Sequence, residues 1–317
     1  MKLLNLLNTF DTKINQLFEF TSGKTVAIYG YGYSGQFIEN VYKRVNKTID
    51  IIIDDNPSVY KEDSYYIRAL DPATTAIIVT FNAAQNVLHY LNSLGFFVDK
   101  NVFLLKNIIP PPPHTHEKIM QNIFNYYLEI NVPGVDFTKI EVDNVSSINA
   151  NNHVYGLSVD YSLINILDNF VIKENDAIFD FGCGKGGTFP IFIKCGFKKI
   201  GGVELDKEIY DTLISNMNLL EIDTVGFYNC DATTLFDIID DYNYFYMYDP
   251  FEGEIFEKVI QNIEESYYRK KREIFIIYTC PTCAKYIEKR KFCHVSKKIM
   301  TRFYGYKEAI IYKISEE

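Results

Sequence analysis

Apolar residues recur at helical spacing at the start of the chain. Between residues 2 and 20 they occupy Leu3, Leu6, Leu7, Phe10, Ile14, Leu17 and Phe18. This spacing predicts an amphipathic helix with one apolar face. The sequence Ser22-Gly23-Lys24 follows and is typical of the turn that ends such a helix.

Beyond that helix, short and continuously apolar segments alternate with segments of helical periodicity. In the first half, helices are predicted up to about residue 44 and around 83–94, and strands at 25–29, 49–53, 76–80 and near 102–105. In the second half, strands are predicted at 177–181, 199–204, 225–229, 244–248 and 273–278. Strands that are apolar throughout and alternate with helices are typical of parallel sheets. The pattern predicts an α/β protein with two Rossmann-like, doubly wound parallel-sheet domains.

Four consecutive prolines, Pro110 to Pro113, separate the two halves. Proline can continue neither a helix nor a central strand, so this run favours a stiff, extended spacer. We therefore predict a Rossmann-like nucleotide-binding domain at residues 1–109. A linker with a connecting helix (117–130) is predicted at 110–131, and a second domain at 132–317.

Length, charge and hydropathy narrow the classes of function. The 317 residues suffice for about two domains. A net charge of −9 argues against a general nucleic-acid-binding surface, which needs a basic footprint. No apolar stretch approaches the length of a membrane span, and Asn5 and Asn8 break the apolar start where a signal peptide would continue. We expect a cytoplasmic protein without a membrane span.

Six cysteines raise the question of a metal site. Cys280 and Cys283 form a Cys-x-x-Cys pair, and Cys293 with His294 follows, which is a set of four residue types that can bind zinc. However, Cys280 ends a predicted strand, and the residues between Cys283 and Cys293 are mostly predicted helix, at 284–291. We therefore expect reduced, structural cysteines and no metal.

The first glycine-rich turn follows the strand at 25–29. Gly30, Gly32 and Gly35 lie between this strand and a helix, and Asp54 follows 19 residues later at the end of the next strand. In that context, backbone amides and a helix N-terminus face an anion, while the acid can bind a ribose. We predict that this domain holds a nucleotide or nucleotide sugar. The alternatives are a scaffold, a homodimer interface, or an NAD(P)-dependent oxidoreductase site.

The second glycine-rich turn has different chemistry. Asp180 opens the sequence Asp-x-Gly-x-Gly-x-Gly, whose glycines are Gly182, Gly184 and Gly186. Glu204 ends the next predicted strand, and Asp231 follows the one after it. Parallel strands bring their carboxyl ends to one crevice, where an acid can accept hydrogen bonds from ribose hydroxyls. Asp180 would repel a pyrophosphate, so the turn favours a nucleoside ligand without phosphates.

These residues resemble those of class I S-adenosylmethionine-dependent methyltransferases, over residues 150–280 or so. The resemblance implies that Asp180 and the turn from Gly182 to Gly186 hold the methionine part of the cofactor. It implies that Glu204 binds the ribose. It also implies that Asp231 and Ala232 bind the adenine and that Tyr155 covers the carboxylate of the cofactor.

Asp249-Pro250-Phe251, after the fourth strand of this half, resembles the element that positions the acceptor nitrogen in amino-group methyltransferases, with one proline missing. Asp249 and His153 are the candidate catalytic bases. The chain also resembles a bacterial subgroup distantly similar to histone-lysine methyltransferases, in which Asn is common at the position of Asp249. The acceptor stays open between a nucleotide sugar, a glycan, a small metabolite and a protein lysine. A non-enzymatic nucleotide-sensing protein is a further alternative.

Overall fold

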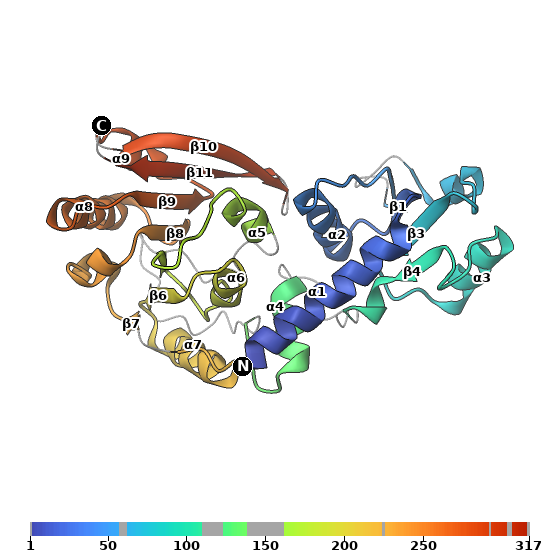
Figure 1. Ribbon diagram of the computed structural model, residues 1–317, viewed down its shortest axis with the longest axis horizontal. Helices are drawn as coiled ribbons and strands as arrows, with labels where there is room; N and C mark the ends of the chain where they lie inside the picture. Colours follow the sequence, from blue (N-terminus) through green and yellow to red (C-terminus); the bar gives the residue numbers. More distant parts are fainter. Residues whose placement is uncertain are drawn as a thin grey trace. The chain divides into compact units, whose positions relative to one another are not determined.

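The structure is a computed structural model that describes residues 2–56, 62–109, 123–137, 162–223, 226–291, 293–302 and 306–315. Its chain forms two compact units, one at Leu4–Tyr127 and the other at Leu128–Glu317 together with Met1–Leu3. The predicted proline linker lies outside the described residues, and the domain boundaries drawn from it remain a prediction. Figure 1 shows the elements of both units.

The unit at Leu4–Tyr127 contains a parallel four-stranded sheet of order β2-β1-β3-β4. The strands are β1 (Thr25–Tyr29), β2 (Ile51–Ile53), β3 (Thr75–Val79) and β4 (Val102–Leu104). The helices are α1 (Lys2–Thr21), α2 (Tyr33–Arg44), α3 (Gln85–Ser93), the short 3-10 helices η1 (Ser64–Ala69) and η2 (Leu105–Asn107), and α4 (Ile123–Asn131), which continues into the second unit. The prediction of four parallel strands with intervening helices is confirmed for this sheet.

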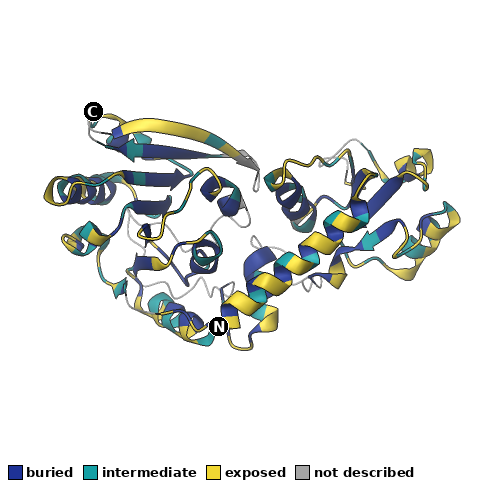
Figure 2. Cartoon of the chain, viewed as in Figure 1, coloured by how far each residue is buried: buried dark blue, intermediate teal, exposed yellow. Residues whose placement is uncertain are grey.

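Helix α1 has the single apolar face that its sequence predicts. Leu7, Phe10, Ile14 and Leu17 are buried, whereas Leu4 on the opposite side is 53% exposed, and Figure 2 shows the resulting stripes. The Phe10 ring makes edge-to-face contacts with Phe37 of α2 and with Phe124 and Tyr127 of α4. The helix is therefore held by tertiary packing of its apolar face.

The second unit contains a seven-stranded sheet of order β10-β11-β9-β8-β5-β6-β7. The first five strands of this unit are parallel to one another. They are β5 (Ala177–Phe181), β6 (Lys199–Glu204), β7 (Phe227–Asn229), β8 (Tyr244–Tyr248) and β9 (Ile274–Thr279). They follow the doubly wound order, with the topological switch between β5 and β8. The helical elements are α5 (Ser162–Leu167), α6 (Phe189–Lys194), α7 (Lys207–Leu219), η5 (Ala232–Thr234), η6 (Ile238–Asp241), α8 (Gly253–Arg269) and α9 (Ala284–Glu288).

The last two strands correct the prediction of a wholly parallel sheet. β10 (Cys293–Arg302) and β11 (Tyr306–Ile314) pair antiparallel with each other, and β11 pairs antiparallel with β9. Helix α9 is also shorter than the predicted 284–291. Figure 2 shows that β10 is largely exposed while β11 is buried. The hairpin therefore adds a polar outer edge to a parallel sheet.

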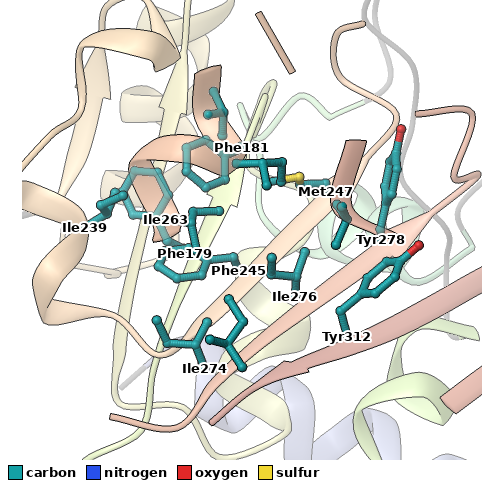
Figure 3. Close-up of a cluster of buried hydrophobic side chains, with 14 of the residues drawn as sticks. Phe179, Phe181, Ile239, Phe245, Met247, Ile263, Ile274, Ile276, Tyr278 and Tyr312 are labelled. Atoms are coloured by element: carbon teal, nitrogen blue, oxygen red, sulfur yellow. The ribbon is translucent and has the colours of Figure 1, made fainter. Parts of the chain in front are cut away.

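Alternation along the strands gives the two faces of this sheet different roles. Phe179, Phe181, Phe245 and Met247 point to one face and pack with Ile263 of α8 and other apolar side chains, as Figure 3 shows. The residues between them, Asp180 of β5 and Tyr246 of β8, point to the opposite face, which α6 covers. Within the described residues, no helix combines the length and the hydropathy that crossing a membrane requires.

Candidate functional site

The glycines of the second turn are required by the fold itself. Gly182 has a φ of 74°, and a Cβ atom there would lie 2.6 Å from the Cβ of Pro250. Gly186 has a φ of 82°, and its Cβ would lie 2.5 Å from Leu213 Cδ1 of α7. Both positions combine a backbone conformation that favours glycine with a neighbour that leaves no room for a side chain. The turn after β5 is therefore packed tightly against Pro250, which follows β8, and against the middle of α7.

Asp180 is buried directly beneath this turn. Its side chain is almost fully enclosed, and its Oδ2 accepts a 2.5 Å hydrogen bond from Thr188 Oγ1. Burial raises the pKa of Asp180 to about 8, the charge of Glu204 adds to the shift, and the bond from Thr188 opposes it. Burial thus favours the neutral form of this carboxyl group, whereas a bound cation would favour its ionised form.

Glu204 closes the strand next to Asp180 and is tied to the same turn. Its Oε2 accepts the backbone N–H of Gly184 at 3.0 Å, and its Oε1 accepts the N–H of Asp206 at 2.9 Å. Burial raises the pKa of Glu204, and these backbone bonds oppose the shift. Asp206 in turn caps α7 by accepting the N–H groups of Glu208 and Ile209. Two backbone hydrogen bonds therefore hold the carboxylate of Glu204 beside the glycine turn.

Asp231 lies after β7 and is exposed. Its Oδ1 accepts the N–H and the Oγ1–H of Thr233, at 2.8 and 2.7 Å, and so caps the short helix η5, which begins at Ala232. Asn229, at the end of β7, donates from Nδ2 to the carbonyl of Glu204 at 2.9 Å. This bond connects the end of β7 to the end of β6, so Glu204 and Asp231 follow neighbouring strand ends as the sequence predicts.

Asp249 follows β8 in an unusual backbone conformation. Its φ is 43°, and Cys280 at the end of the adjacent strand β9 has a φ of 54°. The Oδ1 atom of Asp249 accepts hydrogen bonds from Thr282 Oγ1 at 2.5 Å and from Tyr278 Oη at 3.1 Å. Non-glycine residues in this region are strained, and such strain concentrates at functional sites. Since Pro250 also packs on Gly182, Asp249 is adjacent in sequence to the contact with the glycine turn.

A buried polar network that the sequence pattern does not reveal supports the turn. Lys185 Nζ forms an ion pair with Asp136 Oδ2 at 3.1 Å, and the lysine is almost fully buried. Asn216 of α7 donates from Nδ2 to the carbonyls of Asp136 and Lys185 and accepts the N–H of Asp136. These contacts join residues up to 80 positions apart, a separation that neither spacing nor periodicity can reveal.

Two predicted site residues, His153 and Tyr155, lie outside the described residues. Among the described residues, Cys280, Cys283 and Cys293 are thiols that form no disulfide with one another. In the described part of the chain, no group of three or more His, Cys, Asp or Glu side chains could hold a metal ion.

The first glycine turn has a related construction. Tyr31, directly after Gly30, donates its N–H to Asp54 Oδ2 at 2.6 Å. Gly30 has a φ of 94°, and a Cβ there would lie 2.7 Å from a ring carbon of Phe81. A Cβ at Gly35 would collide with the carbonyl of Gly30.

Gly32 differs from its neighbours in the turn. Its φ of −69° suits any residue, and a Cβ there would meet nothing within 4 Å. Gly32 is the N-cap of α2, where glycine is one of the favoured residues, and it leaves the backbone of the turn open to approach.

No protein-family model and no curated protein matches the chain. Solved structures match the chain over about half of its length. A precorrin-6y C5,15-methyltransferase from Geobacter metallireducens GS-15 is 15% identical, with a TM-score of 0.40, over 50% of this chain and 91% of that one. A magnesium protoporphyrin IX methyltransferase from Synechocystis PCC 6803 with bound S-adenosylmethionine is 15% identical, with a TM-score of 0.38, over 49% of this chain and 77% of that one.

A protein solved in a study of the conversion of a disulfide bond into a thioacetal group during echinomycin biosynthesis is 10% identical. Its TM-score is 0.40, over 48% of this chain and 82% of that one. At these identities and TM-scores the likeness is too distant to assign a function.

Proposed function

We propose that the unit at residues 128–317 is an S-adenosylmethionine-dependent methyltransferase. The observation that carries this proposal is the pair of acids at one glycine turn, the buried Asp180 and the half-buried Glu204. They lie near the ends of adjacent strands, and Gly184 donates its N–H to Glu204 at 3.0 Å. They lie at the carboxyl ends of the strands beside the topological switch, where open α/β sheets bind ligands. Two acids at this place disfavour a phosphate and favour a nucleoside with a cationic arm.

Each predicted residue has a defined part in this proposal. Glu204, held by the turn, would accept the ribose hydroxyls, and Asp231 with Ala232 would face the adenine. Asp180 would meet the cationic part of the cofactor, which supplies an electrophilic methyl group when bound. What the chain contributes to the reaction is chiefly position, since methyl transfer is an in-line displacement that depends on alignment.

For the acceptor, we propose Asp249 as the group that orients it or removes its proton, with His153 as the second candidate base. The two hydroxyls that donate to Asp249 Oδ1 support this, because they fix the carboxylate at the end of β8. The proposed acceptor is a nucleotide sugar, a glycan or a small metabolite, with a protein lysine as the alternative.

Substitution of Glu204 tests the proposed cofactor. Glu204→Gln keeps the shape of the side chain but weakens the ribose contact, so we expect S-adenosylhomocysteine to bind at least about 10-fold more weakly in calorimetry. Glu208→Gln changes an exposed glutamate in the first turn of α7, outside the glycine turn. It is the matched control and should bind S-adenosylhomocysteine as the wild type does. Equal affinity of Glu204→Gln and the wild type would contradict the assignment.

For the unit at residues 4–127, we propose a nucleotide or nucleotide-sugar site at the first turn. Gly32 supports it, because a glycine at this open position lets a ligand approach the backbone of the turn closely. The hydrogen bond from Tyr31 N–H to Asp54 narrows the choice of ligand, because this amide already has a partner and is not available to a phosphate. A ligand that places ribose hydroxyls on Asp54 suits this geometry better than one that relies on the Tyr31 amide for a phosphate.

Titration of the full chain with NAD and with nucleotide sugars tests this second site. Gly32→Ala should fold as the wild type does, because its Cβ meets nothing. It should nevertheless weaken binding of whichever nucleotide the wild type takes up, by at least about 5-fold. If no nucleotide binds the wild type, the unit is a scaffold, as the alternative prediction has it.

A further inference from the structure

Arg68, in the unit at residues 4–127, is held between two tyrosine rings. It belongs to the 3-10 helix η1, and its Cζ atom lies 5.1 Å from the ring centre of Tyr65 in the same helix and 5.8 Å from that of Tyr90 in α3. Its Nε donates a hydrogen bond to Tyr90 Oη at 3.2 Å. Two aromatic rings and one hydrogen bond restrict the guanidinium, so it loses little further freedom when a ligand binds.

The outer part of this guanidinium is open. Arg68 is exposed, and within the described part of the chain it forms no ion pair and donates no hydrogen bond from its Nη atoms. In the C-terminal unit, by contrast, Nη atoms of Arg269, Arg272 and Arg290 donate to carboxylates or backbone carbonyls. An exposed and planar fork of N–H donors is the arrangement that binds a phosphate or a carboxylate through two parallel hydrogen bonds.

Hydrogen bonds connect Arg68 to the end of β1, where the first glycine turn begins. Tyr90 Oη, which holds Arg68, donates to the carbonyl of Ser64 at 3.3 Å. The N–H of Ser64 donates to Asp55 Oδ1 at 2.8 Å, and Asp55 Oδ2 accepts Tyr29 Oη at 3.2 Å. Tyr29 is the last residue of β1 and directly precedes the turn. These contacts place Arg68 near the carboxyl ends of β1 and β2, where open α/β sheets bind ligands.

The first glycine turn itself has acids beside it, which repel an anion. Asp54 and Asp55 follow β2, and the N–H groups of Asn56 and Ser64 donate to them. The N–H of Tyr31 also donates to Asp54, so this amide is not available to a phosphate. Acids in this position suit ribose hydroxyls, whereas the phosphate of the same ligand needs a positive charge outside the turn.

We propose that Arg68 is the phosphate-binding residue of the unit at residues 4–127, and that it takes the phosphate or diphosphate group of the bound nucleotide. This rests on the nucleotide site proposed above and names the group that the glycine turn does not bind. The ribose lies at Asp54 in this arrangement, and the phosphate oxygens accept the two Nη groups of Arg68. The arrangement differs from a dinucleotide turn, in which backbone amides at a helix N-terminus hold the pyrophosphate.

The test compares nucleotides with the nucleosides that they contain. The full chain is titrated in a calorimeter with uridine diphosphate and uridine, and with adenosine diphosphate and adenosine. We expect the wild type to bind one of the two diphosphates at least about 10-fold more tightly than its nucleoside. Arg68→Gln should lose most of this difference, while its affinity for the nucleoside stays within about 2-fold of that of the wild type.

Lys100→Gln is the matched control for charge. Lys100 is an exposed cation that lies over the ring of Phe97 and precedes β4, at the amino end of the sheet. Its replacement removes one positive charge, as Arg68→Gln does, and should change neither affinity. A second variant, Tyr90→Phe, keeps the ring but removes the hydroxyl that holds Arg68 Nε. It should weaken the diphosphate by about 3-fold and leave the nucleoside unchanged.

The outcomes separate this proposal from the function on which it rests. If Arg68→Gln binds the diphosphate as the wild type does, or if Lys100→Gln loses as much as Arg68→Gln, the phosphate site is wrong while the nucleotide site stands. The same conclusion follows if the wild type binds a nucleoside as tightly as its diphosphate. If it binds none of the four compounds, the phosphate site falls, and the titration with NAD and nucleotide sugars decides the nucleotide site.

Thermal unfolding of the ligand-free variants gives a readout that does not depend on binding. Because Arg68 is exposed, Arg68→Gln should melt at the temperature of the wild type. A marked drop in its melting temperature together with an unchanged preference for the diphosphate would assign Arg68 to the stability of the fold and overturn the phosphate site.

Discussion

At the scale of single residues, Asp180 stands out because it is a buried acid with a neighbouring acid and, among the described residues, no cation in contact with it. Its partner is the hydroxyl of Thr188, and the groups that act on it or that it acts on are Glu204, Cys183 and Tyr246. The sequence identified Asp180 because of its place before the glycines. The sequence could not show that Tyr246, one of many tyrosines in the chain, lies opposite Asp180, because that position follows from the pairing of β5 with β8.

The raised pKa of Asp180 predicts how stability depends on pH. Its ordinary value is 3.8 and its value in the fold is about 8, so between these the native protein holds a proton that the unfolded chain has lost. The free energy of unfolding therefore falls as the pH rises through this window, and Asp180→Asn removes that part of the fall. Glu204 shifts in the same direction but is present in both proteins.

Thermal unfolding of the ligand-free protein at about pH 5 and about pH 8.5 measures the effect. We expect the melting temperature to drop less between these two values for Asp180→Asn than for the wild type. An equal drop for both would show that Asp180 is ionised in the fold, and that its burial is compensated by a contact that the structure does not contain.

At the scale of elements, the parallel strands and the lead-in helix were predictable, whereas the final hairpin was not. Strands β5, β6, β8 and β9 are apolar runs buried on both faces, which is the signal that periodicity detects. β10 is an edge strand with polar residues such as Lys297 and Lys298, which are exposed, so its sequence is typical of a loop. β11 does contain the apolar run 309–312, and that run is the signal by which the hairpin could have been predicted.

The turn after β5 gives a prediction about stability. Gly182→Ala should destabilise the protein by about 1–3 kcal/mol more than Gly196→Ala. Both glycines have positive φ, but a Cβ at Gly182 would lie 2.6 Å from Pro250, whereas at Gly196 the nearest atom, of Ile172, is 3.9 Å away. Both sites belong to the same unit and both carry a positive φ, 74° at Gly182 and 106° at Gly196, but only Gly182 adds a close contact.

Urea denaturation of the two variants provides the measurement, with the free energies taken from the transition of the unit at residues 128–317. Equal destabilisation would mean that Pro250 moves aside at little cost. The contact between the glycine turn and the Asp249 segment would then be loose, and the proposed alignment of the acceptor side would lose its structural basis.

At the scale of the whole molecule, the two units repeat one device with different chemistry. In each, the acid that ends the second strand accepts a backbone N–H from the glycine turn after the first: Asp54 from Tyr31, and Glu204 from Gly184. The units differ inside the strand that precedes the glycine turn. In the unit at residues 128–317 this strand contains the buried Asp180, whereas in the unit at residues 4–127 it has only apolar residues between Thr25 and Tyr29. This difference predicts a cationic nucleoside in one unit alone.

The measurement that tests this account most directly is a crystal structure of the full chain grown with S-adenosylhomocysteine. We predict one molecule per chain at the turn after β5, with its ribose hydroxyls on Glu204. A ligand bound only at the Gly30 turn, or none bound at millimolar concentration, would contradict the assignment of the C-terminal unit as a methyltransferase.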